Sequence, residues 1–187
     1  MKKTKFADKI GYWFPLAIVT TIICGCIYVT VQQDMRTSAN DPQIQMAEDA
    51  AAALESGSAI QTVLPIETTR MDTSLAPYMM IFADDGKLRG SSVVLNTTIP
   101  TVPEGVFNTT RQQTETRFTW EPADLVRSAA VVVYYTDGAH DPSRSGFVLV
   151  GRSLREVEKR EDSLTMEVGA AWVAALSISF IAAVALL

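Results

Sequence analysis

The chain has 187 residues, a hydrophobic content of 48% and a formal net charge of −5. That length is typical of one domain rather than two. The acidic balance and the lack of a long basic tract argue against a nucleic-acid-binding protein. The apolar residues are concentrated at the two ends of the chain, whereas the middle has the composition of a soluble domain. This distribution predicts a membrane protein with one soluble domain.

The first apolar segment, residues 11–31, contains 21 residues without a charge. A helix of this length extends about 31 Å, which is enough to cross the hydrocarbon core of a bilayer. Residues 1–10 contain four lysines and one acid, so the positive-inside rule places this end in the cytoplasm. We expect an uncleaved anchor; a cleaved signal peptide and lipidation at Cys26 are the alternatives.

The second apolar segment, residues 168–187, contains 20 residues without a charge and predicts a second transmembrane helix. A removable GPI-anchor signal is the alternative. With two spans, both termini are expected in the cytoplasm and residues 32–167 outside it. Small residues recur at four-residue spacing and suit close helix packing, against the first span or against a second copy, unless they only face lipid: Ala171, Ala175, Ser179 and Ala183.

Residues 32–167 predict a helix followed by five strands. A helix is expected over residues 41–56, because Asn40 is a capping residue and Pro42 suits the first turn. The Asp-Gly pair at Asp85-Gly86 predicts a β-hairpin. The expected strands cover residues 78–82, 88–95, 116–121, 128–136 and 145–150, with a short helix over residues 105–111 and a final helix from Arg152.

The most strand-like segment is residues 128–136, and its β-branched and aromatic residues predict a central, buried position. The whole pattern is that of an α+β domain: an antiparallel sheet of about five strands with flanking helices.

Two segments of this domain resemble known proteins. The segment YMMIFADDGKLRGSS resembles the opening hairpin of the extracytoplasmic PAS-like (Cache-type) sensor domains of bacterial two-span receptors. The segment GFVLVGRSLREVEKRE resembles their exit from the last strand into the helix that returns to the membrane. The resemblance implies a PAS-like fold, with a ligand pocket over one face of the sheet. Such receptors continue into a cytoplasmic output module, and none is expected in this sequence.

The residues that carry chemistry are few. The single histidine, His140, lies in a turn-rich loop with neighbouring aspartates, and we expect those to serve the turn. No catalytic or metal-binding motif is recognised, so we predict a protein that is not an enzyme and has no cofactor or metal. If the fold is PAS-like, the candidate ligand-binding residues are three aromatic residues and two arginines: Trp120, Tyr134, Tyr135, Arg117 and Arg127.

The sequence therefore predicts an extracytoplasmic sensor-like or accessory signalling protein. It would act through a membrane protein partner, or a homodimer formed by the second span, and its domain would bind either a small-molecule ligand or a protein. The alternative is a structural membrane interaction module without a ligand. In the first case the message leaves along the charged helix after Arg152, in which no Gly or Pro occurs before residue 168.

Overall fold

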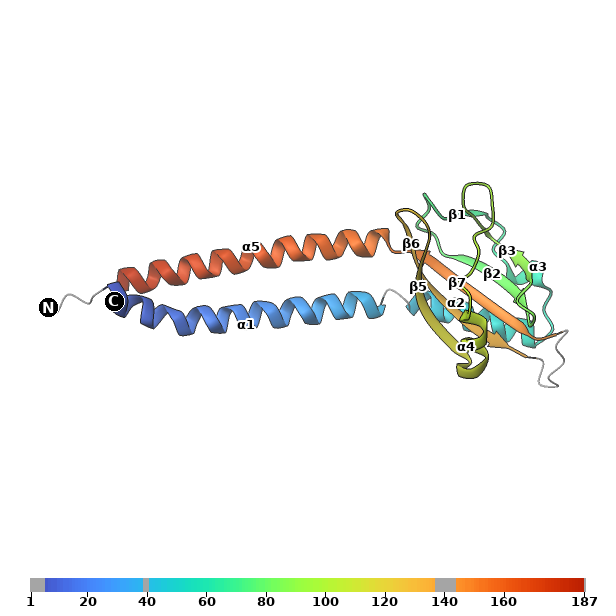
Figure 1. Cartoon of the computed structure of the whole chain (residues 1–187), viewed down its shortest axis with the longest axis horizontal. Coiled ribbons are helices and arrows are strands. Elements are labelled where there is room, and N and C mark those ends of the chain that lie inside the picture. The colour runs from blue at the N-terminus through green and yellow to red at the C-terminus, as the bar shows by residue number, and fades with distance from the viewer. Residues whose placement is uncertain (1–5, 39–40, 137–143, 187) are drawn as a thin grey trace. The chain divides into compact units, whose positions relative to one another are not determined.

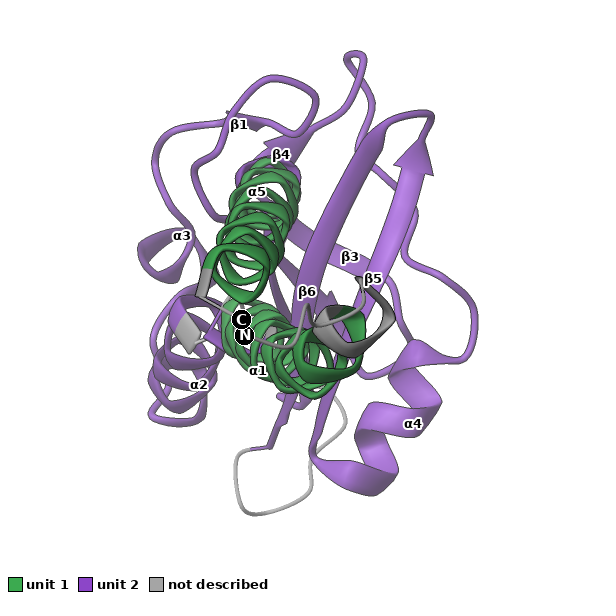
Figure 2. Cartoon of the chain, turned by 90° about the vertical axis from the view of Figure 1, so that its left-hand side faces the viewer, with its two compact units in different colours: residues 1–36, 157–187 green, residues 37–156 purple. Residues whose placement is uncertain are grey.

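The computed structural model describes residues 6–38, 41–136 and 144–186. His140 and the rest of its loop lie outside these residues. The chain forms two compact units: residues 1–36 with 157–187, and residues 37–156 (Figure 2). We call them the helical unit and the sheet unit.

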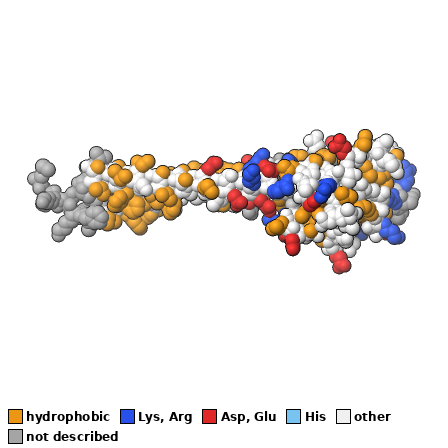
Figure 3. All heavy atoms as spheres, turned by 90° about the horizontal axis from the view of Figure 1, so that it is seen from above, with side chains coloured by type: hydrophobic (Ala, Val, Ile, Leu, Met, Phe, Trp, Pro, Cys, Tyr) orange, Lys and Arg blue, Asp and Glu red, His pale blue; other side chains and the backbone are white. Residues whose placement is uncertain are grey.

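The helical unit contains the two long apolar helices. Helix α1 is Phe6–Ser38 and helix α5 is Arg155–Leu186. Each contains a stretch that is long and apolar enough to cross a membrane, Ile10–Met35 and Arg155–Ala185, and an 18-residue segment within each has a mean hydropathy of 2.1. Hydrophobic side chains gather along these helices (Figure 3). The helices extend beyond the apolar segments found in the sequence, because the charged residues on their inner flanks are helical too.

The sheet unit is built on one antiparallel sheet of five strands (Figure 1). The strands lie in the order β3-β2-β7-β6-β5. Their bounds are β2 Tyr78–Ala83, β3 Leu88–Ser91, β5 Glu115–Ala123, β6 Val126–Tyr135 and β7 Gly146–Ser153. A parallel pair of two-residue strands, β1 (Thr69–Arg70) and β4 (Val93–Val94), lies apart from it. The α+β class and the five antiparallel strands are therefore confirmed.

The central strand of the sheet is β7, so the central position predicted for residues 128–136 is wrong. Strand β6 lies between β7 and the edge strand β5, and it is nevertheless buried along most of its length. A run of Val and Tyr indicates a strand that is buried on both faces. A strand that has a neighbour on each side can be buried in this way without being the central strand. The predicted hairpin is confirmed: β2 and β3 pair around a turn in which Gly86 has φ of 79°.

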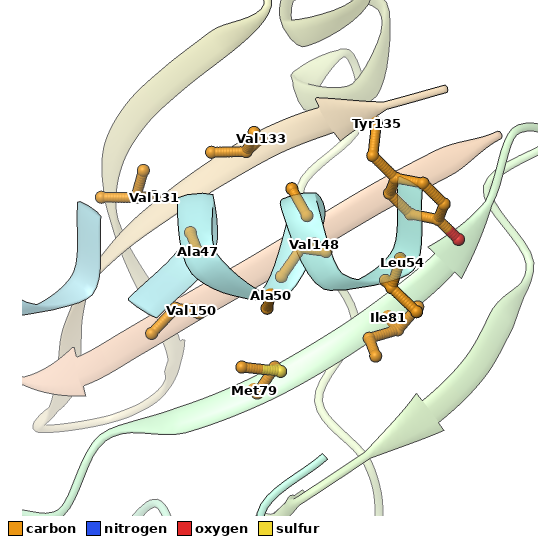
Figure 4. Packing of buried hydrophobic residues seen from close by; sticks show 11 residues of the cluster. Ala47, Ala50, Leu54, Met79, Ile81, Val131, Val133, Tyr135, Val148 and Val150 are labelled. Carbon is orange, nitrogen blue, oxygen red and sulfur yellow. The ribbon is translucent and has the colours of Figure 1, made fainter. Parts of the chain in front are cut away.

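Both faces of the sheet are covered. Helix α2 (Asp41–Glu55) packs on one face, where its small residues Ala47 and Ala50 allow close approach to the sheet (Figure 4). The other face carries a second buried cluster around Phe147 and is contacted by helix α4 (Val106–Gln113). A short helix, α3 (Ile60–Val63), follows α2. Because β2 is buried on both faces, its residues contribute to both clusters.

The burial of β2 gives a direct test of the fold. Ile81 is fully buried under α2, whereas Ile66 is fully exposed. We expect Ile81→Ala to lower the free energy of unfolding by about 2–5 kcal/mol, because it leaves a cavity in the core. The matched Ile66→Ala variant should stay within about 0.5 kcal/mol of the wild type. Denaturant unfolding followed by circular dichroism measures both, and equal effects would contradict the placement of β2.

Candidate functional site

A chain of buried hydrogen bonds links four strands on the face of the sheet opposite α2. The Trp120 indole N–H donates to the Tyr78 hydroxyl oxygen at 3.2 Å. The hydroxyls of Tyr78 and Ser128 are 2.7 Å apart, and the Ser128 hydroxyl donates to the carbonyl of Arg152 at 3.0 Å. Because the hydroxyl hydrogen of Ser128 is used for Arg152, the hydroxyl of Tyr78 donates to the hydroxyl oxygen of Ser128. The chain of donors therefore runs from β5 through β2 and β6 to the end of β7.

The ring of Tyr78 lies directly against Gly151 of β7. A Cβ atom added at Gly151 would lie 2.3 Å from the phenol ring, so a side chain at this position would displace the ring. Burial raises the pKa of Tyr78 to about 12, although its hydrogen bonds with Ser128 and Trp120 act in the opposite direction. The neutral phenol is thus held in a fixed position at the point where β7 ends.

Two arginines, Arg152 in β7 and Arg155 at the start of α5, bind the loop that precedes β2. The Arg152 Nε–H donates to the carbonyl of Leu75 at 3.1 Å, and an Arg155 Nη2–H donates to the carbonyl of Thr73 at 2.8 Å. Arg155 is the first residue of α5, and the N–H of the residue before it donates to the carbonyl of Arg127 in β6 at 2.9 Å. The junction between sheet and helix is therefore fixed to β6 and to residues 71–77.

An apolar groove of about 310 Å³ lies on the same face of the sheet as the Tyr78 hydrogen bonds. It lies between the β2–β3 hairpin, the loop over residues 99–102 and Phe107 of α4. Beside it, the Arg111 guanidinium lies 5.3 Å from the ring centre of Phe147 and donates to the carbonyl of Asp84 at 2.6 Å, which fixes α4 to the hairpin turn. The volume is at the lower end of the range for small-molecule sites, and the lining suits an apolar ligand.

The five residues predicted to bind a ligand do not line this groove. Trp120 is buried in the hydrogen-bonded chain, and the ring of Tyr134 packs 5.1 Å from that of Phe147. Tyr135 points to the opposite face and lies in the cluster under α2, because successive residues of a strand alternate between faces. Arg117 forms an ion pair with Glu115, and the side chain of Arg127 is exposed.

The groove was missed because one of its walls comes from a loop and a short helix. Pro100 and Val102 lie in a segment without periodicity, and no sequence pattern places such a segment over a sheet. The one available signal was the pair of prolines in this loop, Pro100 and Pro103, which indicates a fixed backbone.

Within the helical unit, side-chain hydrogen bonds between described residues join α1 and α5. The indole of Trp13 donates to Ser179 at 3.0 Å, the indole of Trp172 donates to Thr21 at 3.0 Å, and the hydroxyls of Tyr28 and Thr165 are 3.2 Å apart. Each pair joins an aromatic residue to a small hydroxyl residue. The pairs follow one another at intervals of seven or eight residues, which corresponds to two helical turns.

Of the four small residues singled out in the second span, Ser179 contacts α1 through Trp13, and Ala183 is buried. Ala175 is half-buried and Ala171 is exposed. Of these four residues, only Ser179 has a hydrogen bond with α1 among the described residues. A groove of about 310 Å³ remains between the helices, lined by Gly25 and Gly169 among others.

The chain matches no protein-family model, no curated protein and no solved structure in comparisons with each.

The raised pKa of Tyr78 predicts a specific loss of stability at high pH. An unfolded tyrosine titrates near pH 10. The stabilisation from the neutral, buried phenol is therefore complete below about pH 10 and is lost as the pH rises toward 12. We expect the free energy of unfolding of the wild type to fall by about 2–3 kcal/mol more than that of Tyr78→Phe over this range. Unfolding titrations at several pH values measure it, and identical slopes for both proteins would contradict the assignment.

The hydrogen bonds in the helical unit predict a spectroscopic change. Thr21→Val keeps the shape of the side chain but removes the acceptor for the Trp172 indole, so the indole N–H resonance should move upfield in NMR spectra of the chain in nanodiscs. Thr30→Val is the matched control, because Thr30 is an exposed threonine of the same helix. An unchanged Trp172 resonance in Thr21→Val would show that the two helices do not pack in this register.

Proposed function

We propose that this protein is an extracytoplasmic sensor-like or accessory signalling protein, anchored by two spans, that acts through a membrane protein partner. The observation that carries the proposal is the path of the chain at Arg152–Arg155. The central strand β7 ends there, and helix α5 begins two residues after the strand ends and continues into the second apolar stretch. A displacement of the sheet is therefore applied directly to the helix.

The topology of the sheet supports a PAS-like domain. Counted along the chain, the five strands lie in the order 2-1-5-4-3. The opening hairpin and the exit strand, which are the two segments that resemble PAS-like sensor domains, are therefore neighbours in one antiparallel sheet. The apolar groove adds a place for a small ligand over one face of the sheet, as the resemblance implies, and it lies against β2, which pairs with β7 along its whole length.

The positive flank of the first span supports an N-terminus in the cytoplasm and a sheet unit outside it. The sheet unit contains no cysteine, which suits a domain that folds in an oxidising compartment without disulfides. The two cysteines, Cys24 and Cys26, both lie in α1.

A structural interaction module without a ligand is the second candidate. The positions of the predicted ligand-binding residues favour this candidate. Trp120 and Tyr135 are buried in the core of the domain, and Arg117 forms an ion pair with Glu115. The two candidates differ in one respect: a sensor must change its interaction with the partner when the groove is filled, and a module without a ligand must not.

Affinity purification of the full chain in a gentle detergent, with mass spectrometry, tests the proposal. We expect one stoichiometric membrane protein to purify with it. Purification of the chain alone, or retention of the partner by a chain whose two spans are replaced, would contradict a partner bound through the membrane.

Filling the groove separates the two candidates. Val102 lines the groove, and Val102→Trp places a large side chain in it. Leu125→Trp is the control, because Leu125 is almost fully exposed. The sensor proposal predicts that only Val102→Trp changes the amount of partner that purifies with the chain. Equal amounts for both variants would favour the structural module.

A further inference from the structure

We propose that residues 71–77 form a clasp that ties the first turn of α5 to strand β2, and that opening this clasp is the step by which a change in the sheet reaches the helix. The inference deepens the proposed signalling role and rests on it for its purpose. The coupling itself can be measured without a ligand or a partner.

The two ends of the clasp are fixed in the core of the sheet unit. Met71 is buried, and its N–H donates to the carbonyl of Val94 at 3.0 Å. At the other end the loop leads into Tyr78, which is held by its buried hydrogen bonds and by its packing on Gly151. The clasp is therefore a short bridge between two anchored residues.

Between Met71 and Tyr78, backbone carbonyls of the loop accept hydrogen bonds from Arg155 at the start of α5. Arg155 donates to the carbonyls of Asp72 and Thr73, at 3.5 and 2.8 Å. The carboxylate of Asp72 is occupied by Arg70, 2.8 Å away, and this hydrogen bond lowers the pKa of Asp72. The attachment of Arg155 thus depends on carbonyl acceptors that do not titrate, and its geometry depends on the fold of the loop.

The contacts close into a ring. The side chain of Arg152 holds Leu75, the chain continues from Leu75 to Tyr78, and the phenol of Tyr78 returns through Ser128 to the carbonyl of Arg152. A displacement of Tyr78 must therefore move either the end of β7 or the clasp. Since Arg155 holds the same loop, both routes lead to the first turn of α5.

Hydrogen–deuterium exchange of the full chain in nanodiscs tests this coupling in both directions. The amides of residues 159–162 report on the first turn of α5, because they donate to carbonyls one turn earlier. Loss of a hydrogen bond to a charged group corresponds to about a tenfold change in an opening equilibrium. We expect Arg155→Ala to raise exchange about tenfold both in residues 71–77 and in residues 159–162.

Tyr78→Phe provides the second direction, because this variant removes one hydroxyl group and leaves Arg155 intact. If the clasp transmits, exchange in residues 159–162 must rise in Tyr78→Phe as well, since coupling between two sites is reciprocal. Lys87→Ala is the control, because Lys87 pairs with Asp85 in the distant hairpin turn, and it should leave both segments at the wild-type rate.

Wild-type exchange in residues 159–162 of Tyr78→Phe would overturn the proposal. A response of Arg155→Ala confined to one of the two segments would also overturn it. The proposed function fails on a different result, the absence of a membrane partner, so the two can be told apart. Arg155→Lys, which retains a donor, should restore part of the protection in both segments.

Discussion

The sheet unit depends on one buried phenol, that of Tyr78. Its hydroxyl accepts from Trp120 of β5 and bonds to Ser128 of β6, and its ring covers Gly151 of β7. A buried hydroxyl without partners would cost about 1–3 kcal/mol, so this side chain stabilises the sheet only while the neighbouring strands remain in register. Gly151 is required for the same reason, because any side chain there would occupy the space of the ring. Four strands are thus held together at the end from which the chain leaves the sheet.

The position of the Tyr78 contact is the basis of the proposed signalling route. The groove lies against β2 on one side of the sheet centre, and the exit lies at the end of β7. Strand β2 pairs with β7 from Tyr78 to Ala83, so the strand that lines the groove is hydrogen-bonded to Gly146–Gly151 of β7. The proposed signal is mechanical and passes along helix α5, which begins two residues after β7 ends.

Much of the fold could be predicted because β-branched and apolar runs mark buried strands, and Asp85-Gly86 marks a hairpin. The predicted helix over residues 41–56 agrees with α2 within one residue. Its start could be predicted because the signal, a proline suited to the first turn, depends only on neighbouring residues. The order of the strands could not be predicted from the strength of the pattern, because burial on both faces is shared by β2, β6 and β7.

The candidate site was less predictable. Trp120 and Tyr135 belong to the residue types that line pockets, but the same types fill cores, and their faces depend on register. The arginine contacts at the junction involve backbone carbonyls of residues 72–75, which leave no trace in the side-chain pattern. In the helical unit, the hydrogen bonds between aromatic and hydroxyl side chains could not be predicted, because each depends on the register of α1 against α5.

The account depends above all on the side of the membrane on which the sheet unit lies. Thiol labelling of intact cells tests this most directly, with Cys24 and Cys26 replaced by serine and one new cysteine placed at Gln61, an exposed residue of the sheet unit, or at Lys3. The account predicts that a membrane-impermeant maleimide labels Gln61→Cys in intact cells and labels Lys3→Cys only after permeabilisation. Labelling of Lys3→Cys from outside, with Gln61→Cys protected, would contradict it.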